Sequence, residues 1–208
     1  MRKTPLILGL ALLAVLGLTS TTFAYMSSYS TGGFGMMGGY GMMGGYGYTN
    51  NNDHVISSNQ TDDIMNKSLE NATVDKTNNV ISFNQPDVNL TLLGGPEYAD
   101  GKFVAGGLVN PTIKVKKGSK VTLNFINEDE GMPHGIEVIA SPPPYSYMTM
   151  MQGPLYPGAY VPVIPQAENE RYPNASATFV ASQSGTYYYI CQVPGHAAKG
   201  MYGELIIQ

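Results

Sequence analysis

Charged residues are scarce in this chain: they make up 12% of its 208 residues, about half of the share usual in soluble proteins. The formal net charge is −4 at pH 7. Such a chain lacks the basic surface on which nucleic-acid binding depends, so we expect no nucleic-acid partner. A surface of neutral polar groups also changes its charge little when carboxylates are protonated, which would suit an acidic exterior.

Cysteine and histidine are also scarce: the chain has one cysteine and three histidines. A single cysteine cannot form a disulfide within the chain, so Cys191 needs another explanation, of which a buried apolar thiol is the simplest. Three histidines, one of them His54 in a polar linker, are too few for the trinuclear cluster of a multicopper oxidase. The lack of a second cysteine disfavours a binuclear purple-copper site.

The lone cysteine begins a segment that reads Cys-Gln-Val-Pro-Gly-His-Ala-Ala-Lys-Gly-Met, which places Cys191, His196 and Met201 at intervals of five residues. A further histidine, His134, lies upstream in Gly-Met-Pro-His-Gly. Thiolate and thioether ligands select Cu(I), and imidazole accepts both oxidation states of copper. The pattern therefore predicts a blue-copper site with His134, Cys191 and His196 in one plane and Met201 as a weak axial ligand.

Other chemistries fit these residues less well. A Cys/His hydrolase needs an oxyanion hole and a third group that orients the histidine, and Met201 has no role in it. Zinc would accept two histidines, a cysteine and a water, but a thioether is a poor zinc ligand. An electron carrier is therefore favoured over an enzyme, and a metal-free surface adhesion domain is a further alternative.

Three segments are distinguished by composition. Residues 1–24 carry Arg2 and Lys3 before an apolar run, which predicts a secretory signal; because no charge occurs between Lys3 and Asp53, a retained membrane anchor is the alternative. Either way, the rest of the chain lies outside the cytoplasm. Residues 25–52 are a Gly/Met/Tyr-rich low-complexity tether, and residues 53–208 form the globular domain.

The tether repeats Gly-Met-Met-Gly-Gly-Tyr and lacks the apolar area for a core. Its methionines, Met36, Met37, Met42 and Met43, offer thioethers that capture Cu(I) loosely. A copper storage or delivery protein is therefore the second class of function that we consider.

Short apolar stretches separated by Gly and Pro predict an all-β fold, a Greek-key β-sandwich of about eight strands with a short N-terminal helix. The helix is expected at Asp62–Leu69, capped by Thr61, and the region Ser141–Pro165 is expected to be mostly loop. Alternation in the central stretches predicts half-buried antiparallel strands. The expected strands are Val80–Phe83, Val88–Leu93, Lys102–Val109, Ile113–Val115, Val121–Phe125, Gly135–Ala140, Ala175–Ala181, Thr186–Cys191 and Tyr202–Ile207.

The segment Ser184–Ile207 resembles the closing segment of the rusticyanins, type 1 blue-copper proteins of the cupredoxin family from acidophilic iron oxidisers. Gly118–Asn127, which leads to His134, and Pro142–Tyr145 with Met148 are also similar to that family. The resemblance implies a cupredoxin fold and one type 1 copper ion held by His134, Cys191, His196 and Met201.

The resemblance further implies a high-potential electron carrier that works at low pH in the periplasm or on the outer face of the cytoplasmic membrane. Its redox partners would be a c-type cytochrome or a terminal oxidase in the path from iron(II), and we expect a monomer. The family generally has a polar Ser or Asn after the first ligand, where this chain has Gly135.

Apolar residues around the ligands are expected to restrict solvent and raise the potential. The candidates are Met132, Met148, Met150, Met151 and Pro142–Pro144, with Phe125 and Tyr189 in addition. His196 has small neighbours and is the expected edge for electron exchange.

Overall fold

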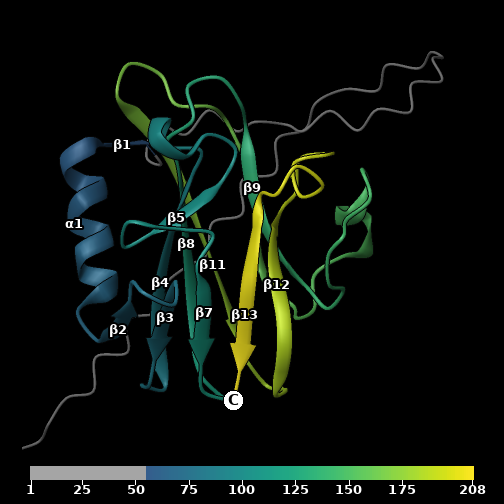
Figure 1. The fold of residues 1–208 in the computed structure, drawn as a ribbon. Helices are drawn as coiled ribbons and strands as arrows, with labels where there is room; N and C mark the ends of the chain where they lie inside the picture. The colour runs from purple at the N-terminus through teal and green to yellow at the C-terminus, as the bar shows by residue number, and fades with distance from the viewer. Residues whose placement is uncertain (1–54) are drawn as a thin grey trace, which may run out of the picture. The chain divides into compact units, whose positions relative to one another are not determined.

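Two β-sheets pack against each other in the part of the chain that the structure, a computed structural model, describes: residues 55–208 (Figure 1). The six-stranded sheet has the order β1 (Val55–Ser57), β11 (Arg171–Val180), β8 (Lys120–Asn127), β4 (Asp87–Gly94), β5 (Phe103–Ala105), β6 (Leu108–Val109). The seven-stranded sheet has the order β10 (Tyr160–Ile164), β9 (His134–Ile139), β12 (Gly185–Cys191), β13 (Tyr202–Ile207), β7 (Thr112–Val115), β3 (Val80–Phe83), β2 (Ala72–Asp75). The predicted β-sandwich is confirmed.

The core lies between the sheets, because alternate residues of each strand face inward. In β8 the alternating buried positions Val121, Leu123 and Phe125 are followed by two further buried residues, Ile126 and Asn127. In β13 the buried positions are Gly203, Leu205 and Ile207. Cys191 and Met201 belong to the same buried cluster. Two predicted copper ligands are thus part of the core itself.

The helix α1 (Ser58–Leu69) lies beside the six-stranded sheet (Figure 1). Ile64 and Met65 pack against a smaller cluster that includes Leu93 and Ile126. The predicted helix is confirmed, but it begins earlier than Asp62. Its N-terminus is closed by Ser57, whose amide donates to Gln60 Oε1 at 3.0 Å.

Several predicted boundaries are wrong. Lys102–Val109 is two strands, β5 and β6, because Gly106 and Gly107 turn the chain with φ of 56° and 74°. The region Ser141–Pro165 contains a 3₁₀ helix at Thr149–Gln152 and the edge strand β10, which lies against β9. The sequence also missed β1 and β2, so the described residues have thirteen strands.

The expectation of antiparallel pairing holds only in part. Strand β8 is antiparallel to β11 but parallel to β4, and β7 is parallel to both β13 and β3. Alternation of apolar residues reports which face is buried and carries no information on the direction of the neighbouring strand.

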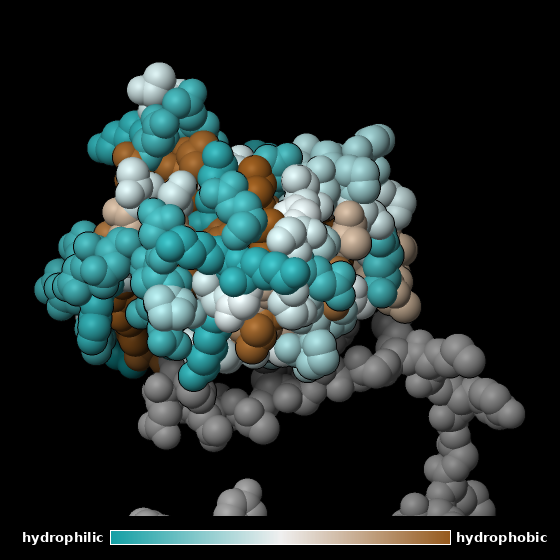
Figure 2. Space-filling view, turned by 90° about the horizontal axis from the view of Figure 1, so that it is seen from below, coloured by the Kyte–Doolittle hydropathy of each residue, from teal (hydrophilic) through white to brown (hydrophobic). Residues whose placement is uncertain are grey.

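The C-terminus lies at the end of the sandwich opposite the loop between β12 and β13 (Figure 1). Figure 2 views the molecule from the end that carries the C-terminus. Among the described residues, hydrophilic ones dominate this face and hydrophobic ones appear as separate spots. Within residues 55–208, no helix is both long and apolar enough to cross a bilayer. The predicted signal or anchor, the tether and His54 lie outside the described residues.

Candidate metal centre

Two neighbouring strands place the first two candidate ligands. His134 is the first residue of β9 and Cys191 is the last residue of β12, and these strands are antiparallel neighbours in which Cys191 pairs with Ile136. The pairing brings together two residues that are far apart in the sequence. The other two candidates, His196 and Met201, follow in the loop that joins β12 to β13.

Backbone hydrogen bonds close this loop. The Cys191 amide donates to the Met201 carbonyl at 3.1 Å, and the Met201 amide donates to the His196 carbonyl at 3.0 Å. At the tip Gly195 has φ of 82°, and its amide donates to the Tyr147 carbonyl at 2.8 Å. Because both ends of the loop are held by strands and its interior by these bonds, the side chains have little freedom to move apart.

Three donor atoms converge on one point. The distance from Cys191 Sγ to Nδ1 of His134 is 3.5 Å, that from Cys191 Sγ to Nδ1 of His196 is 3.6 Å, and the two Nδ1 atoms are 3.2 Å apart. A point equidistant from all three lies about 2.0 Å from each, which is the length of a metal–imidazole bond and slightly short for a metal–thiolate bond. A transition-metal ion therefore fits this triangle.

The candidate ligands are withdrawn from solvent. Cys191, His134 and Met201 are 0% exposed, and His196 is 8% exposed. Of the four, His196 therefore offers the edge nearest to solvent, as the sequence predicted. Met201 belongs to the same buried cluster as Cys191, and its backbone bonds to Cys191 and His196 keep it in the same loop.

Burial changes the ionisation of these groups. It raises the pKa of the Cys191 thiol to about 11, although the amides of Gly135 and Val193 act in the opposite direction. Burial lowers the pKa of His134, against the effect of Asp129, and lowers that of His196 with help from His134 and Lys199. The histidines are thus neutral and ready to bind a metal, whereas the thiol must release its proton to the ion.

The second nitrogen of His134 is held by a residue that the sequence analysis missed. Nε2 of His134 lies 2.8 Å from Oδ2 of Asp129, and both side chains are buried. The signal was present, because Asp129 lies only a few positions before His134 in an acidic loop. A carboxylate on the outer nitrogen of a metal-binding histidine fixes the ring.

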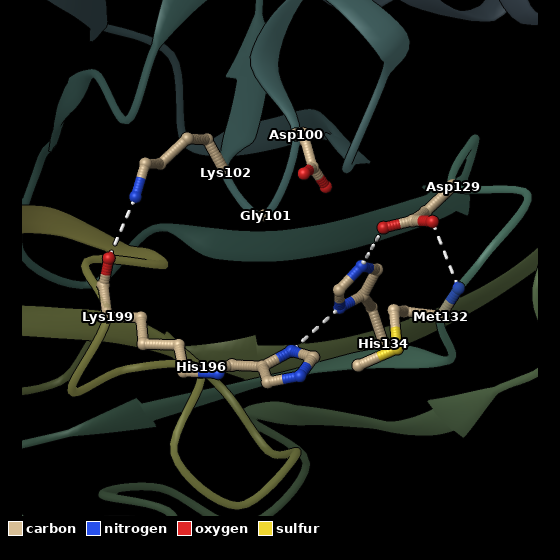
Figure 3. Close-up of a pocket in the computed structure, with 8 residues that line it drawn as sticks. All are labelled: Asp100, Gly101, Lys102, Asp129, Met132, His134, His196 and Lys199. Atoms are coloured by element: carbon tan, nitrogen blue, oxygen red, sulfur yellow. Dashed lines mark hydrogen bonds and ion pairs between the residues drawn. The ribbon is translucent and has the colours of Figure 1, made fainter.

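A pocket of about 300 Å³ opens beside the two imidazoles (Figure 3). Lys102 donates from Nζ to the carbonyl of Lys199 at 2.9 Å on one side, and Asp129 pairs with His134 on the other. The remaining lining residues are Asp100, Gly101, Met132 and His196. Met132 of the predicted rim therefore borders the site.

Of the other predicted rim residues, Pro142 and Pro144 are exposed and Pro143 is half-buried. Met148 and Met151 are 48% and 75% exposed, and Met150 packs against Ile139, Ile190 and Ala197. Phe125 and Tyr189 are instead core residues in the cluster of Cys191 and Met201.

Gly135, the departure from the family pattern, lies where no side chain fits. A Cβ at this position would lie 2.9 Å from Val163 N, 3.0 Å from Pro162 C and 3.0 Å from Oε1 of Gln192. Gln192 itself bonds through its side chain to Glu137 at 3.2 Å and through its amide to the Gly135 carbonyl at 3.3 Å. Gln192 thus ties the strand of His134 to the loop of Cys191.

Comparison with known proteins agrees with this geometry. Residues 107–208 match the model of the copper binding proteins of the plastocyanin/azurin family. The cofactor expected from the sequence, one type 1 copper ion, suits the cupredoxin fold and this donor set, because a thiolate and two imidazoles beside a thioether are what copper selects.

The predicted likeness to rusticyanin is confirmed as well. Over 99 residues this chain is 35% identical to rusticyanin of Acidithiobacillus ferridurans and 34% identical to that of Acidithiobacillus ferrooxidans. The matched residues are 48% of this chain and 51% of each relative. The chain therefore spans about half the length of these curated relatives. A solved structure of rusticyanin from Thiobacillus ferrooxidans superposes with a TM-score of 0.65 at 26% identity, over 74% of this chain and 96% of that one.

Proposed function

We propose that this protein is an electron carrier in which His134, Cys191, His196 and Met201 bind one type 1 copper ion. The observation that supports it most directly is the triangle of Cys191 Sγ and the two histidine Nδ1 atoms, closed to sides of 3.2–3.6 Å inside the core. The thioether of Met201, which is 0% exposed, would serve as the weak fourth ligand of a blue-copper centre.

The rigidity of the site favours electron transfer over catalysis. Bound copper supplies a one-electron couple between Cu(I) and Cu(II). Because three of the candidate ligands are fully buried and the loop is closed by backbone hydrogen bonds, the side chains hold one arrangement for both oxidation states. Electrons would pass through the edge of His196, the candidate ligand with the most exposure.

We place the carrier outside the cytoplasm, in the electron path from iron(II) to a c-type cytochrome or a terminal oxidase. The likeness to rusticyanins of Acidithiobacillus supports this role, as does a sequence with few charges. In this proposal residues 1–24 are the signal or anchor, residues 25–52 the tether, and residues 53–208 a monomeric copper domain.

The test is to load the full chain with copper and follow it through repeated reduction and reoxidation. A carrier shows the visible thiolate charge-transfer band in the oxidised state, loses it on reduction and regains it fully on each cycle. A delivery protein instead loses Cu(I) to an added acceptor after the first reduction. Absence of the band in a copper-loaded sample would contradict the type 1 assignment.

A matched control separates the ligands from the fold. Cys191→Ser removes the thiolate but keeps a small polar side chain at the same buried position, so the band should vanish while the sandwich stays folded. Addition of copper to this variant should then produce no thiolate charge-transfer band.

A further inference from the structure

Asp129 is the focus of hydrogen bonds next to the candidate metal centre. Its Oδ1 accepts from the amides of Gly131 at 2.7 Å and Met132 at 2.9 Å, and its Oδ2 lies 2.8 Å from Nε2 of His134 (Figure 3). Two backbone amides and one imidazole therefore form hydrogen bonds with the two carboxylate oxygens of Asp129. The two amides are donors that cannot reverse their role.

Only a carboxylate bonds to all three groups and leaves Nδ1 of His134 without a proton. An asparagine would accept from the two amides at its oxygen and donate its NH₂ group to Nε2 of His134, so the ring would carry its proton on Nδ1. A carboxylate accepts at both oxygens, which requires His134 to carry its proton on Nε2. The lone pair of Nδ1 is then free and faces Cys191 Sγ and His196 Nδ1 at 3.5 Å and 3.2 Å.

The backbone around Asp129 is built to hold this arrangement. The Asp129 amide donates to Oδ1 of Asn127 at 3.2 Å, and its carbonyl accepts from the Ala167 amide at 2.7 Å. Gly95, with φ of 58°, approaches so closely that a Cβ there would lie 2.6 Å from Oδ2 of Asp129. Asp129 is only 8% exposed, so its charge is weakly screened by solvent.

We propose that Asp129 is a positioning residue of the copper centre. It fixes the ring and the tautomer of His134, and its negative charge favours Cu(II) over Cu(I), which lowers the reduction potential relative to a neutral residue at this position. This inference rests on the proposed function, because it concerns the same copper ion.

The test compares Asp129→Asn with Asp100→Asn in the full chain loaded with copper. Both variants remove one negative charge beside the same pocket, but the structure shows no hydrogen bond from Asp100 to either histidine. We expect Asp129→Asn to bind copper about 10- to 100-fold more weakly. We also expect it to have a higher reduction potential and an altered charge-transfer band, whereas Asp100→Asn keeps the wild-type band and affinity.

Equal affinity, potential and spectrum in the two variants would overturn the inference. If Asp129→Asn fails to fold, nuclear magnetic resonance of the wild-type Cu(I) protein tests the inference through the ring proton of His134. The ring proton of His134 should then reside on Nε2 with the strongly downfield shift of a hydrogen bond to a carboxylate, and an ordinary shift would overturn the inference. Failure of the proposed function is distinguishable, because the wild-type protein itself would then lack the charge-transfer band.

Discussion

Gly135→Ala tests the reasoning about close packing beside the first candidate ligand. The added methyl would meet Val163 N at 2.9 Å and Pro162 C at 3.0 Å, both of them backbone atoms of β10, and Oε1 of Gln192 at 3.0 Å. Contacts this short force the neighbours to move. The side chain of Gln192 can adopt another rotamer if it gives up its hydrogen bond to Glu137. The backbone atoms of β10 can move away only if the whole edge strand shifts.

Overpacking of this kind costs about 1–3 kcal/mol in the free energy of unfolding. For a domain of this size, we expect a fall in Tm of about 4–8 °C for a cost near 2 kcal/mol. The measurement is thermal unfolding of the metal-free protein followed by circular dichroism. Because Gly135 directly follows His134, we also expect the copper-loaded variant to show a shifted charge-transfer band.

Gly131→Ala is the matched control. Gly131 lies in the loop just before β9, and a Cβ there would make only an ordinary contact, 3.4 Å from Oδ1 of Asp129. Its Tm should change little. A Gly135→Ala protein as stable as wild type would refute the argument that the space beside this glycine is filled by β10 and Gln192.

Three further predictions concern the ligands, a buried carboxyl and the metal. His196→Ala should abolish or alter the visible charge-transfer absorption, and an unchanged copper spectrum would remove His196 from the ligand set. Glu137 is 3% exposed, its Oε1 has no hydrogen-bond partner, and burial raises its pKa. A raised pKa gives stability at low pH that is lost as pH rises through the folded-state pKa, so Glu137→Gln should be more stable than wild type at pH 7 and lose this advantage in acid. Urea unfolding of both proteins at pH 7 and at acidic pH measures this difference in stability. A difference that does not change with pH would contradict its assignment to the ionisation of Glu137. At a free copper concentration a thousandfold above Kd, bound copper should raise the free energy of unfolding by about 4 kcal/mol over that of the copper-free protein. Equal stability of the copper-loaded and copper-free proteins would show that copper binds the folded chain no more tightly than the unfolded chain.

Local pattern was sufficient for much of the fold. Val80–Phe83 was predicted with the bounds that β3 has, and β4, β8, β12 and β13 were found within two residues of theirs. Strands β3, β8 and β13 alternate over most of their length because one face is buried in the core. The strands that were missed are short or at edges, such as β1 and β10, where the burial pattern is weak.

The candidate site was predictable where its residues are close in sequence. Cys191, His196 and Met201 share one loop, and soft sulfur ligands beside imidazole indicate copper from chemistry alone. Asp129 was missed because its nearness to His134 in the sequence does not show that its carboxylate faces the ring. Its role depends on how far its carboxylate lies from His134.

The amino-acid sequence by itself determined the class of fold, the soft-metal chemistry and the four candidate ligands, because burial pattern and donor type are properties of the residues. Only the tertiary structure decided which residues meet. The pairing of β9 with β12 sets the distance between His134 and Cys191, the approach of Gly95 leaves room for Asp129, and β10 fills the space beside Gly135. Such contacts join residues far apart in the chain, so they depend on strand order and register, which no local pattern encodes.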